Sequence, residues 1–324
     1  MPINKDNPEQ WLDDIDASVA YYNEWFMTFA PEAFRDTRAA TSHQVDKALA
    51  VTKNLTDLTP QVLMESPDIL PILRMATCPP IARDRLMGIA GLSKNLISKM
   101  EDPVNPSIPP RMPKEDLMEQ LDRLLSIIQK MADPDLFLWL SENRQPTESE
   151  KQRAAAVIAD RLCGNITDPI IRNAQEKRQL TALRQYLKHK GYSQVDSAKG
   201  VRFNELKPGE FSFRMNIPVY LNRGSERQYG IHIPINAVVQ PLSSRRGDFP
   251  LLLEAKSAGD FTNVNKRRKE EAQKMQQLRN TYGPNVRFVL FLCGYFDAGY
   301  LGYEASEGID WIWEHRIDDL EEYL

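Results

Sequence analysis

The pattern of apolar residues changes near residue 165 and divides the sequence into a helical half and a strand-rich half. Before it, apolar residues recur at steps of three and four, which predicts helices over residues 10–30, 114–133 and 147–163. The third begins with Thr147 and Glu150, a capping-box pattern. Four prolines between residues 106 and 113 predict an extended connection there. We therefore expect residues 1–165 to form a mainly helical region.

The second half, residues 166–324, carries both helix and strand signals. Asp168 and Pro169 are typical of a helix start, and Gly191 of its end. Another helix is predicted over residues 264–281, and a short one at the C-terminus. Runs of β-branched and aromatic residues predict strands in 202–221, 227–241, 249–257 and 287–294, with a turn at 222–224. This order predicts an α/β (α+β) fold in which a mixed β-sheet is flanked by helices.

Two charged residues follow directly after the most apolar strand signal of this half. The run Leu251–Leu253 leads into Glu254-Ala255-Lys256, and side chains two positions apart on a strand share a face. Buried charges are costly unless they are paired or bind an ion. We therefore predict that Glu254 holds a cation and Lys256 meets an anion; an edge-strand ion pair is the alternative. The triplet is not specific by itself, because Glu205-Leu206-Lys207 repeats it in a polar turn.

A basic segment comes next and is predicted to run into a helix. Residues 264–279 hold six basic and two acidic residues, a net charge of +4. Cations in the first turn of a helix are disfavoured by the helix dipole. Their position beside a candidate ion site therefore indicates phosphate binding. The DNA contacts predicted in this segment are Asn263, Asn265, Lys266, Arg267, Arg268 and Lys269.

The order of strand, E-x-K, polar turn and basic helix resembles the PD-(D/E)xK nuclease core. Moreover, the chain is similar throughout to the XamI-type family of type II restriction endonucleases. The segments that carry this likeness are RMATCPPIARDRLMGIAGLS (74–93), DPIIRNAQEKRQL (168–180), EAKSAGDFTNVNKRRKEEAQKMQQL (254–278) and FLCGYFDAGYLGYEASEGIDW (291–311). The resemblance implies Mg²⁺-dependent, sequence-specific hydrolysis of double-stranded DNA, at a GTCGAC-like site. It also implies a homodimer matched to a palindromic site, and a cognate DNA methyltransferase that protects the host DNA.

The resemblance also assigns roles to three residues. In the PD-(D/E)xK core an acid ends one strand of a hairpin, and the E-x-K pair lies on the neighbouring strand. The two carboxylates hold Mg²⁺, and the lysine orients the attacking water or stabilises charge on the phosphate. Glu254 and Lys256 match the second and third roles. Asn236, 18 residues before Glu254, stands where the metal-binding aspartate is expected.

An asparagine at this position is nearly isosteric with aspartate but lacks the charge that favours Mg²⁺. Three explanations are open. Asn236 is an engineered inactivating substitution, the chain is a naturally impaired nuclease, or another residue supplies the metal-binding carboxylate. We favour the first explanation. Candidates for the third are Asp248, which we interpret as a loop residue, and Glu176, which we interpret as an i,i+4 partner of Arg172.

We expect residues 1–165 to contribute to DNA recognition or dimerisation, and two segments of the chain are candidates for reading DNA. Residues 87–100 resemble a helix-turn-helix in which Ser93 caps the second helix and Lys94 and Asn95 face a groove. An ordinary pair of packed helices is the alternative. In the loop between the two predicted catalytic strands, Arg245 and Arg246 could reach a guanine.

The net charge of −4 hides an uneven distribution. Residues 1–35 carry −5 and residues 304–324 carry −7, so the middle of the chain carries +8. A basic middle suits a DNA-binding protein, and we expect the acidic ends to lie away from DNA. No window is apolar enough to span a membrane and the N-terminus lacks a secretion signal, so we expect a cytoplasmic protein. The alternatives are a DNA-binding protein that does not cleave and a structure-specific repair or defence nuclease.

Overall fold

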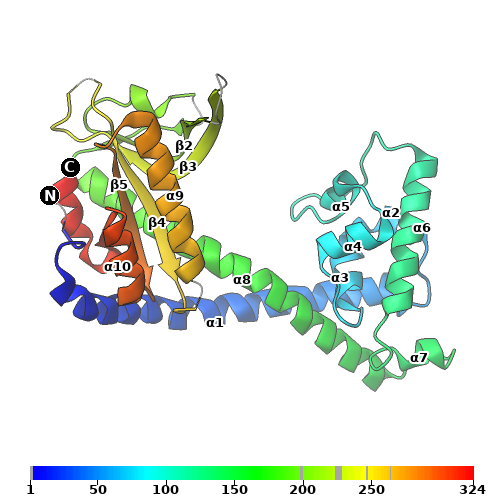
Figure 1. Cartoon of the computed structure of the whole chain (residues 1–324). Helices are drawn as coiled ribbons and strands as arrows, with labels where there is room; N and C mark the ends of the chain where they lie inside the picture. The colour runs from blue at the N-terminus through cyan, green and yellow to red at the C-terminus, as the bar shows by residue number, and fades with distance from the viewer. Residues whose placement is uncertain (1–2, 198–199, 223–227, 246, 263) are drawn as a thin grey trace. The chain divides into compact units, whose positions relative to one another are not determined.

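A computed structural model describes residues 3–197, 200–222, 228–245, 247–262 and 264–324. Of residues 221, 222, 228, 229 and 264–268 it describes the backbone. The elements are η1(Pro8–Gln10), α1(Trp11–Val51), α2(Pro60–Glu65), η2(Pro67–Ile69), α3(Leu70–Met75), α4(Arg83–Ala90), α5(Lys94–Met100), α6(Lys114–Met131), α7(Leu138–Ser141), α8(Glu148–His189), β1(Ser193–Gln194), η4(Phe203–Glu205), β2(Glu210–Asn222), β3(Gln228–Val239), β4(Leu251–Ala258), α9(Val264–Tyr282), β5(Arg287–Gly294), α10(Ala298–Ser306), β6(Asp310–Trp313) and η5(Glu314–Tyr323) (Figure 1).

The chain forms two compact units, which we name by their content. The helical unit comprises residues Ala30–Ile171, and the sheet unit comprises Met1–Phe29 together with Arg172–Leu324. The sequence predicts a division at residue 165, with residues 1–29 in the helical region. In the structure these residues contribute to the sheet unit, where the carboxylate of buried Asp310 accepts hydrogen bonds from the backbone N–H groups of Ile3, Asn4 and Lys5.

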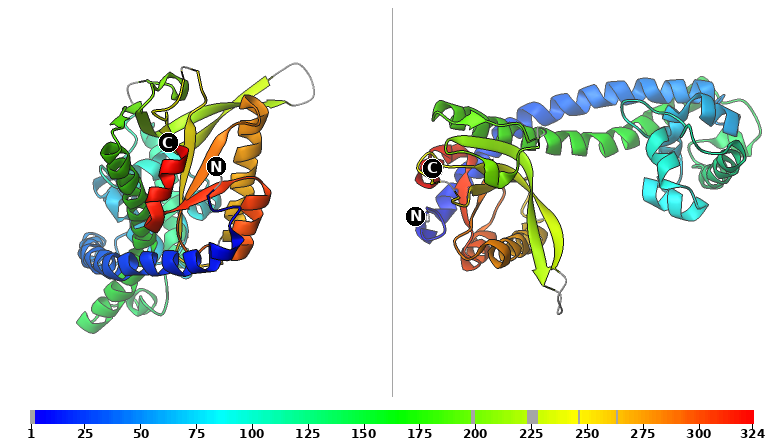
Figure 2. Two further views of the ribbon diagram at one scale, coloured as in Figure 1. Left: turned by 90° about the vertical axis from the view of Figure 1, so that its left-hand side faces the viewer. Right: turned by 90° about the horizontal axis from the view of Figure 1, so that it is seen from above.

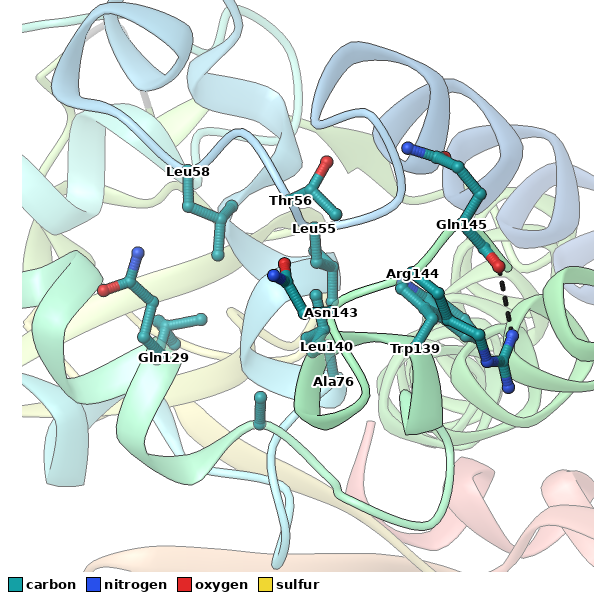
Figure 3. A pocket seen from close by; sticks show the side chains of 12 residues that line it. Leu55, Thr56, Leu58, Ala76, Gln129, Trp139, Leu140, Asn143, Arg144 and Gln145 are labelled. Carbon is teal, nitrogen blue, oxygen red and sulfur yellow. Dashed lines mark hydrogen bonds between the residues drawn. The ribbon is translucent and has the colours of Figure 1, made fainter.

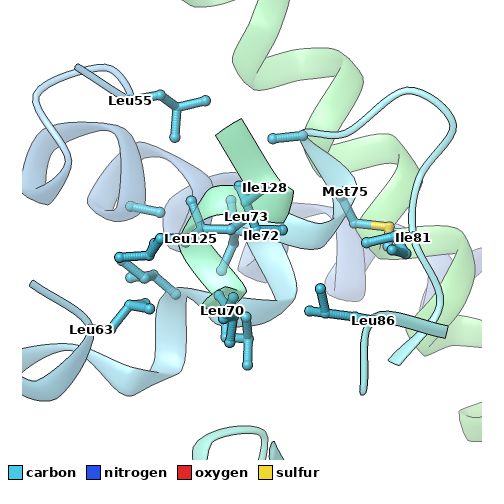
Figure 4. Close-up of a cluster of buried hydrophobic side chains, with 14 of the residues drawn as sticks. Leu55, Leu63, Leu70, Ile72, Leu73, Met75, Ile81, Leu86, Leu125 and Ile128 are labelled. Carbon is cyan, nitrogen blue, oxygen red and sulfur yellow. The ribbon is translucent and has the colours of Figure 1, made fainter. Parts of the chain in front are cut away.

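The helical unit is built on an apolar core around α3 and α6. Leu70 and Leu73 of α3 are buried together with Leu125 and Ile128 of α6 (Figure 4). Each such side chain contributes roughly 1.5–3 kcal/mol by leaving water. The helix predicted after Pro113 is confirmed as α6, because its apolar stripe faces this core.

The sheet unit contains a six-stranded mixed sheet in the order β1-β2-β3-β4-β5-β6. The β2–β3–β4 meander is antiparallel, whereas β1 pairs parallel to β2, and β4, β5 and β6 are parallel. The predicted mixed sheet is therefore confirmed. The predicted turn at 222–224 lies largely outside the described residues.

Two apolar layers cover the sheet. On one face, Leu252 and Leu290 pack against Met275 and Leu278 of α9 and against α10. On the other face, Leu251 and Leu253 pack against Leu183 and Leu187 of α8 and against η5 (Figure 2). Because neighbouring residues of β4 alternate between these layers, its even-numbered side chains point toward α9. The flanking helices predicted from sequence are present.

Several predicted boundaries were wrong: the helix expected over 10–30 continues to Val51, and the strand expected from residue 202 begins at Glu210. The helices expected over 147–163 and from residue 168 onward are a single helix, α8, with Pro169 inside it. Its start was predicted correctly, since the Glu150 carboxylate accepts from Thr147 N–H at 2.8 Å. Pro169 cannot donate a backbone hydrogen bond. The helix nevertheless continues, because its turns on both sides are anchored by buried residues such as Leu162 and Leu180. Within the described residues, no helix has the length and apolar character needed to cross a membrane.

Candidate active site

Glu254 and Lys256 lie on the central strand β4, between β3 and β5. The edge-strand part of the alternative is therefore wrong, because β4 lies inside the sheet, but the two residues do form an ion pair, with Lys256 Nζ 3.4 Å from Glu254 Oε1. Glu254 is buried and Lys256 is largely buried. Both side chains point to the face covered by α9, because they share the parity of Leu252. A buried carboxylate and a buried ammonium on one face require partners, and α9 supplies them.

Four charged groups form a buried cluster between β4 and α9. The Lys274 Nζ donates to Glu254 Oε1 at 2.6 Å. The Lys256 Nζ lies 2.9 Å from Glu271 Oε1 and 3.4 Å from Glu254 Oε1. Two carboxylates therefore face two ammonium groups. We name Glu254, Lys256, Glu271 and Lys274 the charge cluster.

The electrostatics of the cluster keep Lys256 charged. Burial by itself lowers the pKa of Lys256, but the carboxylates of Glu271 and Glu254 outweigh this effect and raise it. Burial raises the pKa of Glu271, and the Lys256 ammonium opposes that rise. Lys256 is therefore an ammonium at neutral pH, as a group that meets a phosphate must be.

Glu271 and Lys274 are not among the site residues predicted from sequence. Both were counted among the charges of a basic helix, yet Glu271 is fully buried. A signal was present: Glu271, Met275 and Leu278 recur at i, i+4 and i+7 and form the stripe of α9 that faces the sheet. An acidic residue inside such a stripe indicates a buried partner of opposite charge.

Asn236 lies where β2 and β3 switch faces. The β2–β3 pairing includes Phe213↔Ala237 and Met215↔Ile235 but skips Arg214 and Asn236 between them. Arg214 has a φ of 54°, in the left-handed region that costs a non-glycine residue about 1 kcal/mol or more. Beyond this point odd-numbered residues of both strands move from the α8 layer to the α9 layer.

This switch directs the Asn236 side chain to the gap where β3 and β4 separate. Pairing between these strands ends at Ala237↔Leu253, so Asn236 and Glu254 are the next residues on either side. The Asn236 Oδ1 accepts from the backbone N–H of Ala255 at 3.0 Å. The structure thus brings Asn236 and the E-x-K segment together, as the resemblance implied.

Glu176 of α8 also reaches this point. Its Oε1 lies 3.5 Å from Asn236 Nδ2 and 3.1 Å from Arg214 Nη2. The structure shows an ion pair of Glu176 with Arg214, and the expected pairing with Arg172 on the same helix stays a prediction. One turn along, Gln179 Nε2 donates to the carbonyl of Phe291 on β5 at 3.1 Å, which ties α8 to the sheet beside the site.

The oxygen atoms here could hold a divalent metal ion. The Oε2 atom of Glu254 is buried and has no hydrogen-bond partner within the described part of the chain. Glu176 adds a second carboxylate and Asn236 an amide oxygen. Mg²⁺ usually binds through one or two carboxylates and keeps its other positions for water and substrate phosphate. Among the described residues, no group of three or more His, Cys, Asp and Glu side chains is placed to hold a metal ion.

The other predicted DNA contacts fall into three sets. Lys269 and Arg245 are exposed, and the Arg245 N–H donates to Asp248 in the β3–β4 loop at 2.7 Å. Lys94 and Asn95 are exposed on α5, whose cap is formed by Ser93 Oγ accepting from Leu96 N–H at 3.1 Å. Outside the described residues lie Asn263 and Arg246, as do the side chains of Asn265, Lys266, Arg267 and Arg268.

Each unit also contains a sizeable groove or pocket. In the sheet unit, a groove of about 630 Å³ between α8 and β2 is lined by basic side chains, Lys177, Arg184 and Arg214. Arg214 connects this groove to Glu176 and Asn236. In the helical unit, a pocket of about 620 Å³ has Trp139 and Arg144 in its wall (Figure 3).

Together with its similarity to known proteins, these features define the chain as a type II restriction endonuclease, a site-specific deoxyribonuclease. The chain belongs to the XamI restriction endonuclease family, whose model matches residues 53–313. It is 48% identical over 319 residues to the type II restriction enzyme SalI of Streptomyces albus G, with 98% of both chains covered. It is 25% identical over 153 residues to the type II restriction enzyme XamI of Xanthomonas campestris pv. amaranthicola, a match that covers 45% of this chain and 51% of that one. No solved structure matches the chain.

Proposed function

We propose that the chain cleaves double-stranded DNA with a PD-(D/E)xK active site formed by Glu254, Lys256, Asn236 and Glu176. Type II restriction enzymes generally use a divalent metal ion, and we assign Mg²⁺ to Glu254, Asn236 and Glu176. The observation that carries this proposal is the position of Glu254 and Lys256 on a central strand, beside the only break in the β2–β3 pairing of the described residues.

The roles follow from charge and position. A bound Mg²⁺ would polarise the scissile phosphate and lower the pKa of an attacking water. Lys256, kept as an ammonium by Glu271 and Glu254, donates hydrogen bonds to that water or to the developing charge on the phosphate. Glu176 supplies the negative charge that Asn236 lacks.

The DNA contacts we propose surround this site. The groove with Lys177, Arg184 and Arg214 is a path for backbone phosphates, as is the start of α9 with Lys269. The helical unit adds Lys94 and Asn95 as candidates for base contacts. We also propose a homodimer that matches a palindromic site, cytoplasmic action in a bacterial or archaeal cell, and a cognate methyltransferase. Analytical ultracentrifugation tests the dimer.

The chain offers its own control for the active-site assignment. Glu254→Gln and Lys256→Ala should abolish cleavage of a plasmid carrying a GTCGAC-like site. The second E-x-K triplet lies at η4, so Glu205→Gln and Lys207→Ala should leave cleavage unchanged. Discrete fragments from the Glu254→Gln variant at the normal rate would refute the assignment.

A further inference from the structure

The charge cluster is electrically balanced without a metal ion. Glu254 and Glu271 carry two negative charges, and Lys256 and Lys274 carry two positive ones. Each of the four side chains is at most 20% exposed, so water screens them weakly. A divalent cation that joins this cluster would add two charges to a balanced set. A divalent cation at Glu254 Oε2, which has no described hydrogen-bond partner, would lie next to both ammonium groups and repel them, so the more weakly held of the two moves away.

The contacts decide which ammonium moves. Lys256 lies between two carboxylates, and Glu271 is fully buried. If Lys256 left, Glu271 would be a buried charge without compensation, which is strongly unfavourable. Lys274 has Glu254 Oε1 at 2.6 Å and the Pro234 carbonyl at 3.5 Å as its described partners. When Lys274 leaves, the metal itself compensates Glu254.

We propose that Lys274 is a placeholder cation, which occupies Glu254 Oε1 until a divalent metal ion displaces it. This inference rests on the proposed metal site at Glu254. It gives Lys274 a role in metal affinity rather than in the chemical step. The ion pair supplies a counter-charge to the Glu254 carboxylate in the metal-free chain, and it weakens metal binding because the metal must first break it.

The test measures metal binding to the full chain without DNA. Mn²⁺ is titrated by calorimetry into the unmodified chain and into Lys274→Met, which keeps an unbranched side chain one atom shorter and removes its charge. We expect the Kd to fall at least about tenfold, or about 1.4 kcal/mol. Lys188→Met is the matched control, because Lys188 is an exposed lysine of α8 in the same unit; its Kd should stay unchanged.

Thermal unfolding supplies a second readout. Metal-free Lys274→Met should melt at a lower temperature than the unmodified chain, because Glu254 loses a counter-charge. Added Mg²⁺ should raise its Tm more than it raises that of the unmodified chain. If Lys274→Met does not fold, Lys274→Gln removes the charge while retaining a hydrogen-bond donor, and circular dichroism verifies its fold.

The outcomes separate this inference from the proposed function. If Glu254→Gln loses metal binding while Lys274→Met and Lys274→Gln bind no more tightly than the unmodified chain, the placeholder role is wrong and the metal site stands. If Glu254→Gln binds metal as well as the unmodified chain, the metal site at Glu254 and the placeholder role both fail.

Discussion

The carboxylate of Glu176 lies 3.5 Å from the side-chain amide of Asn236, so an acid from α8 and an uncharged residue of β3 share one corner of the site. The resemblance implies a single aspartate at this corner. An acid delivered by the helix can restore the missing charge without any change in the strand. This arrangement favours the third explanation of Asn236 considered from sequence.

Glu176→Gln should therefore lower the cleavage rate more than about a hundredfold, beyond the range usual for partners of metal ligands. The double variant Glu176→Gln with Asn236→Asp should recover much of that loss, since the carboxylate returns on β3. Single-turnover cleavage of a plasmid measures both. If the unmodified chain does not cut and Asn236→Asp alone does, Asn236 is an inactivating substitution. If neither cuts while the unmodified chain binds DNA tightly, the non-cleaving alternative is correct.

Glu271→Gln should slow cleavage by about ten- to a hundredfold, because Lys256 loses the charge that positions its ammonium. The effect should appear in kcat, with KM little changed, since Glu271 is buried and cannot touch DNA. Glu270→Gln is the neighbouring control on the exposed side of α9. Equal kinetics for the two variants would show that Glu271 does not position Lys256.

If Lys94 contacts a phosphate, Lys94→Ala should weaken binding to all DNA sequences similarly. The slope of log binding constant against log salt concentration should then become shallower by about one. Asn95→Ala should cost about 1–3 kcal/mol at the cognate site and little elsewhere, if Asn95 reads a base. Fluorescence anisotropy in Ca²⁺ measures both. Lys130→Ala on α6 is an exposed control in the same unit. If Lys94→Ala and Asn95→Ala both bind DNA like the unmodified chain, α4 and α5 are an ordinary helix pair.

His315 should make the fold sensitive to mild acid. Burial lowers its pKa in the folded state, whereas the unfolded chain keeps a value near 6.5. The unfolded state therefore binds the proton more readily, and stability falls as pH drops through about 6.5 until the folded-state pKa is reached. Urea unfolding at pH 7.5 and 5.5 measures the fall in the free energy of unfolding. This fall should be smaller in His315→Phe. It should be unchanged in His43→Gln, because His43 is exposed.

Local patterns were enough to place the E-x-K segment. The apolar run before Glu254 predicts a buried strand, and alternation places Lys256 on the same face. The i, i+4, i+7 stripe of α9 could also have placed Glu271. Both patterns depend on residues close together in sequence, so they can be read without the fold.

The corner formed by Asn236 and Glu176 depends on contacts that sequence patterns do not carry. Arg214 is neither Gly nor Asn, so its left-handed φ and the switch of faces have no local signature. Pro169 gave a misleading signal, because it is typical of a helix start. Packing on both sides of the proline outweighed that local preference.

Both boundaries between the two units fall within helices. α1 passes from one unit to the other next to Pro31, and α8 does so next to Pro169. An exchange of residues 30–171 with those of a relative must therefore join two helices in phase. Inserting or deleting one residue at either junction rotates every following side chain of that helix by about 100°. Recombination of this unit between relatives is thus restricted to partners whose helices keep the same phase at both junctions.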